Sequence, residues 1–224
     1  MNEGGTPRRI ATRALSADDA EALPAALRIL RSGGTVVFPT DTVYGVGSDP
    51  WSPEAVARLY WVKQRPREMA IPLLVSAPHH VERVVSDLPD AFQRVAARFW
   101  PGGLTLVLPR HPAVPHIVTA GGPTIAVRMP GHPLARALIE AAGGVLAVTS
   151  ANRSGNPAPV TAEAARADLD GRVDLVIDGG ASPCGVASAV IDLVRTPPRQ
   201  LRAGGIPFAA LRVVLPDLVD ASRG

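Results

Sequence analysis

Apolar residues recur along the chain with two spacings, and the spacing predicts where helices and strands form. Recurrence every three or four positions, as in residues 18–31, predicts an amphipathic helix, which Gly33 and Gly34 end. Short uninterrupted apolar runs predict buried strands. By these criteria helices are expected at 18–31, 53–62, 78–86, 88–99, 133–142 and 161–169, and strands at 35–38, 72–75, 104–108, 124–128, 145–148, 173–177, 188–194 and 199–202.

The order of these segments predicts the fold class and the domain limits. Helices separate most of the strands, which favours a partly parallel α/β sheet, whereas the last strands follow one another directly, which indicates a mixed sheet. No repeat or linker divides the chain, so we expect a single domain over residues 18–215. Residues 1–17 are polar and contain Gly and Pro, which predicts a flexible N-terminal arm, and residues 216–224 are expected to form a C-terminal tail.

The composition is that of a globular protein with modest positive charge. The chain has 224 residues, of which 46% are hydrophobic and 19% charged, which excludes the disordered and fibrous classes. Only 4% are aromatic, so few rings are available to stack on bases. The formal charge of +3, with arginines spread from Arg8 to Arg223, favours anionic small molecules or a weak RNA contact over a dedicated polybasic binder.

Cysteine content and hydropathy indicate the compartment. Cys184 is the one cysteine, so the chain cannot form an internal disulfide. No apolar segment follows a charged N-terminus, and no apolar run approaches the roughly 20 residues that a membrane span requires. We therefore expect a cytoplasmic protein with no membrane contact.

Polar side chains follow several predicted strands where the strands end, which is where open α/β sheets bind ligands. The segments are FPTDTVYGVG at 38–47, TIAVRMP at 124–130, VTSANRSGNPAP at 148–159, SAVID at 188–192 and LRAGG at 201–205. Arg128, at the end of the second segment, either stays exposed at the rim or pairs with an anion. The third segment offers hydroxyls, an amide and backbone N–H groups, which suit a phosphate, although an ordinary turn has the same residues.

Several known signatures are absent from the sequence. It has no G-x-x-x-x-G-K-[ST] motif of a P-loop, no complete Rossmann fingerprint and no G-x-S-x-G elbow of a hydrolase. The five histidines, among them His79, His80 and His132, lack metal-ligand spacing with acids or with Cys184. We therefore expect no metal site formed by protein side chains.

One lysine stands out in a chain whose other basic residues are arginines. Lys63 is the only lysine among 23 basic residues, and it lies in WVKQRP, where the helix 53–62 ends. A compact ammonium can approach phosphate or carboxylate oxygens as a point charge, which a broad guanidinium does less well. Lys63 is therefore a candidate contact for an anion. The alternative is that a single lysine occurs by chance in an arginine-rich chain.

The segments in order resemble one family. FPTDTVYGVG, KQRP, WPGGLTLVL, AVRMPGHP, TSANRSGNPAP, SAVIDL and LRAGGI are similar to successive blocks of the YrdC/Sua5 threonylcarbamoyl-AMP synthases, from about residue 20 to residue 207. The length matches the short, YrdC-type members. The resemblance implies a twisted mixed sheet with flanking helices around a concave, basic pocket. It also implies an activity, in which L-threonine, bicarbonate and ATP give threonylcarbamoyl-AMP and pyrophosphate.

The same motifs imply where the substrates bind. The resemblance places L-threonine near Thr42, Ser76, Arg128, Val148 and Ser188. It places ATP near Lys63, Arg65, Thr124, Ser150, Asn152, Ala158 and Arg202, with Lys63 and Arg65 as the catalytic cations. The chemistry agrees, because an arginine can hold a carboxylate with two parallel hydrogen bonds and a triphosphate requires several cations and hydroxyls.

The resemblance also implies a mechanism, a cofactor and a partner. The threonine amine is expected to become a carbamate, whose oxygen attacks the α-phosphorus of ATP while pyrophosphate leaves. Mg²⁺ is expected to assist on the phosphates. A separate tRNA threonylcarbamoyl transferase complex is the expected consumer of the product, at adenosine 37 of tRNA.

Some positions depart from the family pattern, and two other functions stay open. Met69-Ala70-Ile71 intervenes before Pro72, and Ala187, Ala189 and Ala203 replace usual family residues, so weakened activity is an alternative. One rival function is a non-catalytic RNA- or tRNA-binding module of the same fold. The other is the carbamoyl-adenylate activity of hydrogenase-maturation proteins, against which the lack of acylphosphatase and zinc-finger segments argues.

Overall fold

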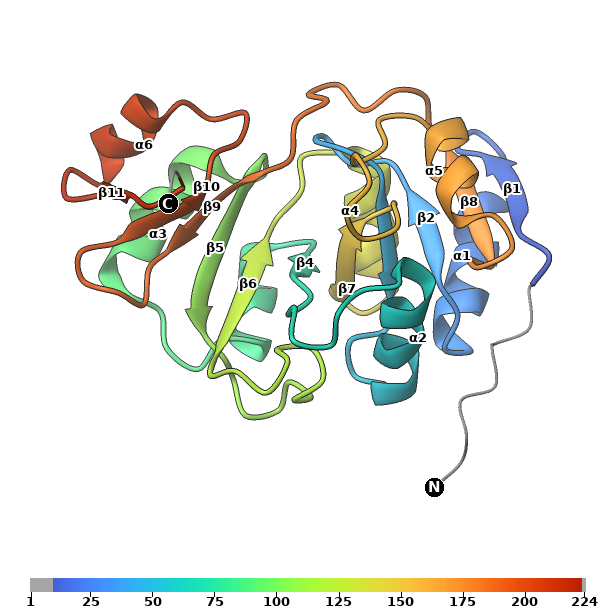
Figure 1. The fold of residues 1–224 in the computed structure, drawn as a ribbon, viewed down its shortest axis with the longest axis horizontal. Coiled ribbons are helices and arrows are strands. Elements are labelled where there is room, and N and C mark those ends of the chain that lie inside the picture. Colours follow the sequence, from blue (N-terminus) through green and yellow to red (C-terminus); the bar gives the residue numbers. More distant parts are fainter. Residues whose placement is uncertain (1–9, 223–224) are drawn as a thin grey trace.

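Eleven strands form one twisted, mixed sheet within residues 10–222, the part of the chain that the computed structural model describes (Figure 1). The strands are β1 Arg13–Ser16, β2 Val36–Phe38, β3 Gly45–Ser48, β4 Leu73–Val75, β5 Leu104–Pro109, β6 Thr124–Arg128, β7 Val145–Ser150, β8 Leu175–Asp178, β9 Ala189–Asp192, β10 Arg199–Arg202 and β11 Val219–Asp220. Their spatial order is β1-β8-β2-β3-β7-β4-β6-β5-β9-β10-β11. Parallel and antiparallel pairs alternate irregularly, which confirms the predicted mixed α/β sheet.

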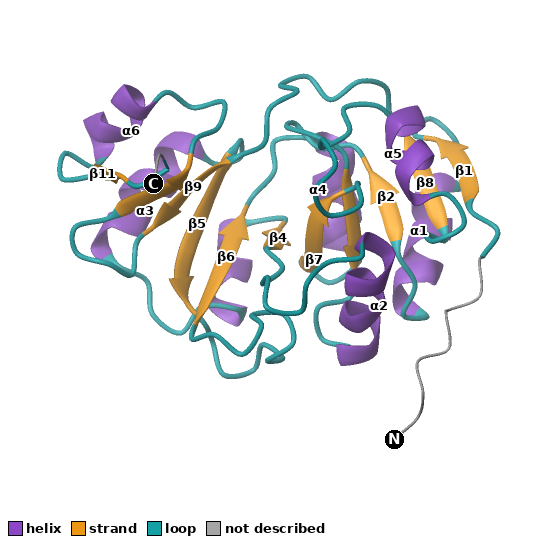
Figure 2. Ribbon diagram, in the orientation of Figure 1, coloured by secondary structure: helices purple, strands orange, loops and turns teal. Residues whose placement is uncertain are grey.

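Helices flank the sheet on both sides (Figure 2). They are α1 Ala22–Arg31, α2 Pro53–Lys63, α3 Asp90–Phe99, α4 Pro133–Ala141, α5 Ala162–Leu169 and α6 Phe208–Val214, with the short 3-10 helix η1 Pro78–Arg83. α1 and α4 pack against each other and cover one face of the sheet over β8, β2, β7 and β4. The same face is left uncovered by these helices over β6 and β5, so a hollow can form there.

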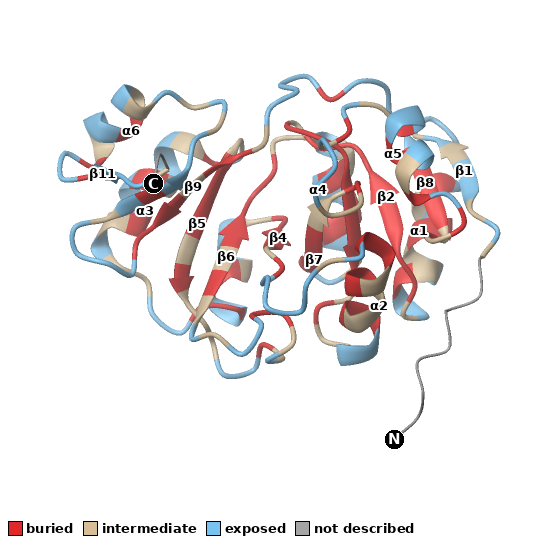
Figure 3. Cartoon of the chain, in the orientation of Figure 1, coloured by how far each residue is buried: buried red, intermediate tan, exposed pale blue. Residues whose placement is uncertain are grey.

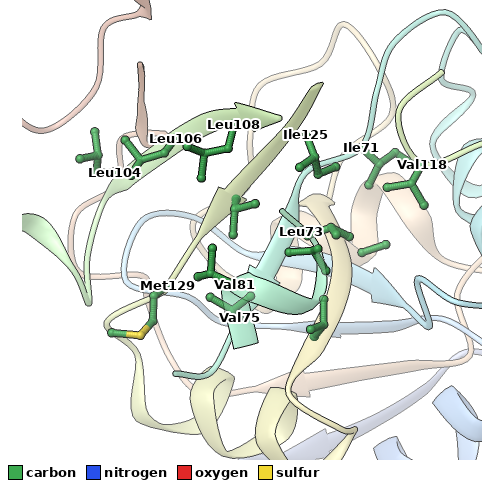
Figure 4. Packing of buried hydrophobic residues seen from close by; sticks show 14 of the residues in the cluster. Ile71, Leu73, Val75, Val81, Leu104, Leu106, Leu108, Val118, Ile125 and Met129 are labelled. Carbon is green, nitrogen blue, oxygen red and sulfur yellow. The ribbon is translucent and has the colours of Figure 1, made fainter. Parts of the chain in front are cut away.

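The core consists mainly of aliphatic side chains in two layers, one on each face of the sheet. Buried residues predominate in the central strands (Figure 3). Figure 4 shows part of the larger layer, where Leu104, Leu106 and Leu108 follow one another along β5 and Ile71 lies beside Val118. On the opposite face, Leu74 packs with the α1 and α4 layer, and it pairs in register with Arg128 of the parallel strand β6. The register therefore brings a cation next to an apolar floor, at the point where the helical cover ends.

Local sequence signals set the direction of α2, which carries Lys63. The helix begins after Ser52, whose hydroxyl accepts the Ala55 N–H at 3.2 Å, and Pro53 occupies the first turn. It ends at Gln64, whose φ of 51° is left-handed, and the Arg65 N–H then bonds the Tyr60 carbonyl at 2.9 Å. Lys63 therefore lies in the last turn, next to the sheet.

The structure corrects the prediction at both ends of the chain. β1 lies in residues that were expected to belong to a flexible arm over 1–17, and it pairs with β8 in parallel register. The polar residues of β1 are tolerated because it is an edge strand with exposed side chains. β11 lies within the expected tail 216–224, and α6 precedes it. Residues 1–9 and 223–224 lie outside the described part of the chain.

β3 is a further element that the apolar pattern did not predict. Its sequence GVGS contains two glycines, which weaken a strand in isolation. The glycines are required by close packing, because a Cβ on Gly45 would lie 2.8 Å from Cγ1 of Val148. β3 therefore forms because β2 and β7 pair with it on both sides.

Candidate functional site

A cavity of about 230 Å³ opens where the uncovered face of the sheet meets the loops that follow β2 and β7. Six separate parts of the chain contribute to it: the β2–β3 loop, β4, β5, the end of β6, the β7 end with its loop, and the β9–β10 pair. The lining residues are Thr40, Thr42, Val43, Tyr44, Gly45, Pro72, Leu74, Thr105, Arg128, Val148, Thr149, Ser150, Asn152, Asn156, Ala158, Ala187, Ser188 and Arg202. The lining combines an apolar floor with hydroxyls and two arginines.

Arg128 forms one wall of the cavity, and its guanidinium is held on three sides. Nε donates to the Gly102 carbonyl at 2.9 Å, one terminal nitrogen donates to the Thr42 hydroxyl at 2.7 Å, and the other donates to Oδ1 of Asp41 at 2.5 Å. Burial lowers the pKa of Arg128, and the nearby Asp41 carboxylate raises it again. The Arg128–Asp41 pair therefore supplies directed hydrogen bonds with a largely compensated charge.

The β2–β3 loop is braced by its own hydroxyl groups. The hydroxyls of Thr42 and Thr40 lie 3.0 Å apart, and Thr40 donates to the Val43 carbonyl at 2.7 Å. The phenol of Tyr44 donates to the Gly180 carbonyl at 2.6 Å, so the loop is also tied to the segment after β8. These hydrogen bonds fix the position of the Thr42 hydroxyl, which accepts a hydrogen bond from Arg128.

Arg202 lies on another wall and is held by neutral groups. Its Nε donates to the Ser188 carbonyl and its terminal nitrogen to the Ser188 hydroxyl, each at 3.0 Å. The Ser188 hydroxyl lies 2.7 Å from that of Thr105. Burial lowers the pKa of Arg202, and its positive charge in turn lowers the pKa of Arg128. Within residues 10–222 Arg202 forms no ion pair, so it is the uncompensated cation of the cavity.

The loop after β7 has a fixed shape, although its sequence resembles an ordinary turn. The amide of Asn152 donates to the carbonyls of Arg153 at 2.9 Å and Asn156 at 2.6 Å. The amide of Asn156 in turn donates to the Asp168 carboxylate at 2.7 Å. The Ser150 hydroxyl bonds no group within the described residues and lines the cavity, so it is available to a ligand.

Lys63 lies beneath this loop, with 1% of its surface exposed. Its ammonium donates to the Ser150 carbonyl, to the Asn152 carbonyl at 2.6 Å and to Oδ1 of Asn152 at 3.4 Å. Burial and, to a smaller extent, the charge of Arg65 lower the pKa of Lys63 to about 7, and Asp168 opposes the shift. The ammonium therefore holds the loop from below.

A second hollow, of about 430 Å³, adjoins the cavity at Ser150 and Asn152. Its lining residues are Lys63, Arg65, Pro66, Met69, Ser150, Asn152, Ser154 and Gly155. Arg65 donates to the carbonyls of Met69 at 3.0 Å and Ala70 at 2.8 Å, and burial lowers its pKa. The two hollows together form a continuous basic site around the β7 loop.

Comparison with known proteins assigns this site to a family. A sequence profile of the Sua5/YciO/YrdC family, described as telomere recombination, matches residues 28–204. The chain belongs to the Sua5/YciO/YrdC family. The match includes both arginines of the cavity, Lys63 and the complete β7 loop.

Relatives and solved structures of the Sua5/YciO/YrdC family agree with this assignment. Threonylcarbamoyl-AMP synthase of Pyrococcus abyssi is 40% identical over 189 residues, which are 84% of this chain and 56% of that protein. Threonylcarbamoyl-AMP synthase of Bacillus subtilis is 40% identical over 205 residues, 91% of this chain and 59% of that protein. The structure of P. abyssi Sua5 complexed with L-threonine has a TM-score of 0.88 at 37% identity, covering 94% of this chain and 62% of that one. The chain thus spans less than two thirds of each.

The structure brings together most of the residues that the Sua5/YciO/YrdC motifs predict. The residues that line the cavity or the second hollow are Thr42, Lys63, Arg65, Arg128, Val148, Ser150, Asn152, Ala158, Ser188 and Arg202. Their contacts with threonine or ATP stay predictions. Lys63 differs in one respect, since we expected an ammonium among phosphate oxygens and it is instead engaged by loop carbonyls.

Two predicted residues of the family motifs lie outside the cavity. Ser76 lies past the end of β4 and beneath α4, where its hydroxyl donates to Oε2 of Glu140 at 2.5 Å. Its prediction as a threonine contact is not supported, because α4 covers this part of the sheet. Thr124 lies at the other end of β6, four residues before Arg128, and does not line either hollow.

Sequence reasoning missed three contributors to the family site. Asp41 was conspicuous in the Thr-Asp-Thr run, but only the fold shows that it pairs with Arg128. Thr105 is concealed within the apolar strand β5, and Tyr44 within a glycine-rich segment. The strand register could have indicated Thr105, since it pairs with Val190 next to the predicted Ser188 and Ala189.

The described residues include neither a cluster of metal-ligating side chains nor a membrane-spanning helix. Within residues 10–222, no three His, Cys, Asp or Glu side chains cluster in a way that suits a metal ion. No helix of this part of the chain has the length and hydropathy to cross a membrane.

Proposed function

We propose that this chain is an L-threonylcarbamoyladenylate synthase, a nucleotidyltransferase that converts L-threonine, bicarbonate and ATP into threonylcarbamoyl-AMP and pyrophosphate. The observation that carries the proposal is the convergence of Arg128, Arg202 and the braced β7 loop on one cavity. The names of the 40% identical relatives and the threonine complex of a similar structure support it.

The amino acid fits the closed part of the cavity. Arg128 has five N–H groups, of which three are donated to protein partners, so one on each terminal nitrogen is left for a carboxylate. Leu74, Val148 and Pro72 form an apolar floor that can accept the methyl group of threonine. Hydroxyl groups beside this floor can bond the hydroxyl of threonine.

The nucleotide fits the open part, around the β7 loop. The Ser150 hydroxyl and the Arg65 and Arg202 guanidinium groups can bond phosphate oxygens, and Lys63 keeps the loop in place. Mg²⁺ is proposed to arrive with ATP. Within residues 10–222 no carboxylate lines either hollow, so phosphate oxygens and loop oxygens would hold the ion. When bound, it would neutralise charge on the triphosphate.

The reaction requires no covalent enzyme intermediate. The threonine amine and bicarbonate first give a carbamate and water. A carbamate oxygen then forms a bond to the α-phosphorus of ATP, while the bond between the α-phosphorus and the leaving pyrophosphate breaks. The protein's contribution is to hold two anionic reactants side by side and to compensate the charge that builds up. Arg202, which lines the cavity and forms no ion pair within residues 10–222, is proposed to neutralise part of this charge.

The test is an incubation with ATP, L-threonine and labelled bicarbonate. We expect pyrophosphate release that depends on threonine, together with a labelled adenylate. A separate tRNA threonylcarbamoyl transferase complex is the proposed consumer of this product. RNA affinity with a steep salt dependence and no pyrophosphate would instead favour the RNA-binding module.

A further inference from the structure

Asp41 has contacts that the proposed chemistry leaves unexplained. A single oxygen, Oδ1, accepts both the Arg128 terminal N–H at 2.5 Å and the Gly131 backbone N–H at 2.9 Å. The carbonyl of Asp41 accepts the Cys184 N–H at 3.1 Å. Asp41 therefore joins the β2–β3 loop to the turn after β6 and to the segment that leads to Ser188.

These contacts determine how Arg128 presents its free N–H groups. The guanidinium is planar, so its orientation is fixed once its three edges each bond a rigid partner. Gly102 and Thr42 occupy two of these edges, and Asp41 occupies the third. Without the Asp41 oxygen, the guanidinium would keep only the Gly102 and Thr42 partners, so its plane could tilt about the side-chain torsions and the two remaining donors would lose their fixed direction.

We propose that Asp41 is a positioning residue, which orients Arg128 so that its free N–H groups meet the carboxylate of the amino-acid substrate. The inference rests on the proposed function for the identity of that substrate. It assigns Asp41 no contact with the reacting atoms. Because both contacts use one oxygen, an asparagine can keep both of them; it differs from the aspartate in charge and in having an NH2 group in place of Oδ2.

The chain offers a matched control far from the cavity. Asp174 also bonds an arginine and a backbone N–H: Oδ1 accepts from Arg58 at 2.6 Å, and Oδ2 accepts from Thr35 at 2.8 Å. It lines neither hollow. Loss of this carboxylate would disturb the fold to a comparable degree and leave Arg128 untouched.

The experiment compares Asp41→Ala, Asp41→Asn and Asp174→Ala with the unmodified chain. L-Threonine binding is measured by calorimetry, and KM is measured for threonine and for ATP. We expect Asp41→Ala to weaken threonine binding by about tenfold or more, since a charge-assisted contact loses its geometry. Asp41→Asn should stay within about threefold, because it keeps the acceptor oxygen. The KM for ATP should stay within about twofold throughout, as should threonine binding by Asp174→Ala.

Several outcomes would overturn the inference. One is threonine binding by folded Asp41→Ala within twofold of the unmodified chain, and another is equal weakening by Ala and Asn, which would indicate charge rather than position. A parallel rise of the KM for ATP would indicate a merely structural role.

The NMR signal of the Arg128 Nε–H supplies a readout without substrate: it should persist in Asp41→Asn and broaden in Asp41→Ala. If the unmodified chain binds no threonine, the proposed function fails, and this signal alone decides whether Asp41 holds Arg128.

Discussion

Arg128 and Lys63 are two buried cations at opposite ends of the site, and they are compensated in different ways. Arg128 has a carboxylate partner, Asp41, whereas Lys63 has only carbonyl and amide oxygens of the β7 loop. A carboxylate cancels the charge that burial penalises, while neutral oxygens do so only in part. The amino-acid end is therefore expected to keep its charge at all working pH values. The loop end carries a cation whose pKa lies near neutrality.

The largest expected effect is the loss of the loop cation. Lys63→Met fills the buried space and removes the ammonium hydrogen bonds to Ser150 and Asn152; the Ser150 carbonyl keeps the Asn152 N–H at 3.0 Å, whereas the Asn152 carbonyl loses the ammonium donor. We expect kcat/KM for adenylate formation to fall by about a hundredfold, as when a preorganised electrostatic contact is lost. Thermal unfolding is the control: the variant should unfold cooperatively at a lower melting temperature, because a buried carbonyl has lost its donor, and it should be fully folded at the assay temperature. Unchanged turnover would contradict the role given to Lys63.

A smaller effect is expected from the uncompensated arginine. Arg202→Ala removes the one cavity cation without a carboxylate partner within residues 10–222. We expect the KM for ATP to rise by about tenfold, since charge-assisted bonds to phosphate are lost. Arg199 lies on the same strand β10 and is exposed, so Arg199→Ala is the matched control. Equal effects of the two substitutions would show that overall charge matters and the position does not.

The pH dependence separates the two cations more finely. Burial lowers the pKa of Lys63 from 10.5 to about 7, so the ammonium loses a donor as the pH rises through 7. We expect kcat/KM to fall by about threefold between pH 6.5 and 8.5, and this decline should be absent in Lys63→Met. A decline that persists in Lys63→Met would point to another group.

The lowered pKa of Lys63 should make the free energy of unfolding rise with pH, whereas kcat/KM falls with pH. Between about pH 7 and 10.5 the unfolded chain keeps the Lys63 proton that the folded chain has lost. The unfolded state then binds more protons, so the free energy of unfolding rises with pH in this window relative to Lys63→Met. Urea unfolding at pH 7 and pH 9.5 measures the free energy of unfolding of the unmodified chain minus that of Lys63→Met. A decrease of this difference with pH would contradict the lowered pKa of Lys63.

The smallest effect is expected at Ser76, which lines neither hollow. Its hydroxyl bonds Glu140 beneath α4, so Ser76→Ala should leave the KM for threonine within about twofold. Ser188→Ala is the comparison, because it removes a bond to Arg202 and a neighbour of Thr105, and should raise KM by about fivefold. A large effect of Ser76→Ala would restore it as a substrate contact.

The sequence predicted the elements whose signals are local. The helix that ends at Lys63 has a capping serine, a proline and an acidic first turn, and its limits were predicted to within one residue. The strand ending at Arg128 was predicted as 124–128, as observed. β1, β3 and β11 were missed because a neighbouring strand stabilises each of them, and their own residues have weak strand propensity.

The site was predictable in its residues and less so in their roles. The strand-end rule located Arg128, Ser150 and Ser188 correctly at one cavity. It could not show that Asp41 already accepts a hydrogen bond from one terminal nitrogen of Arg128, or that loop carbonyls accept hydrogen bonds from the ammonium of Lys63. Such contacts join residues about 87 positions apart, so no local pattern encodes them.

The two outermost strands limit how this sheet can meet other proteins. β1 has four residues and begins with Arg13, and β11 has only two, close to Pro216. Strands this short offer few free backbone groups for a foreign strand to extend the ladder. An interacting macromolecule would then dock on side chains or on loops, and the chain is protected against edge-to-edge self-association.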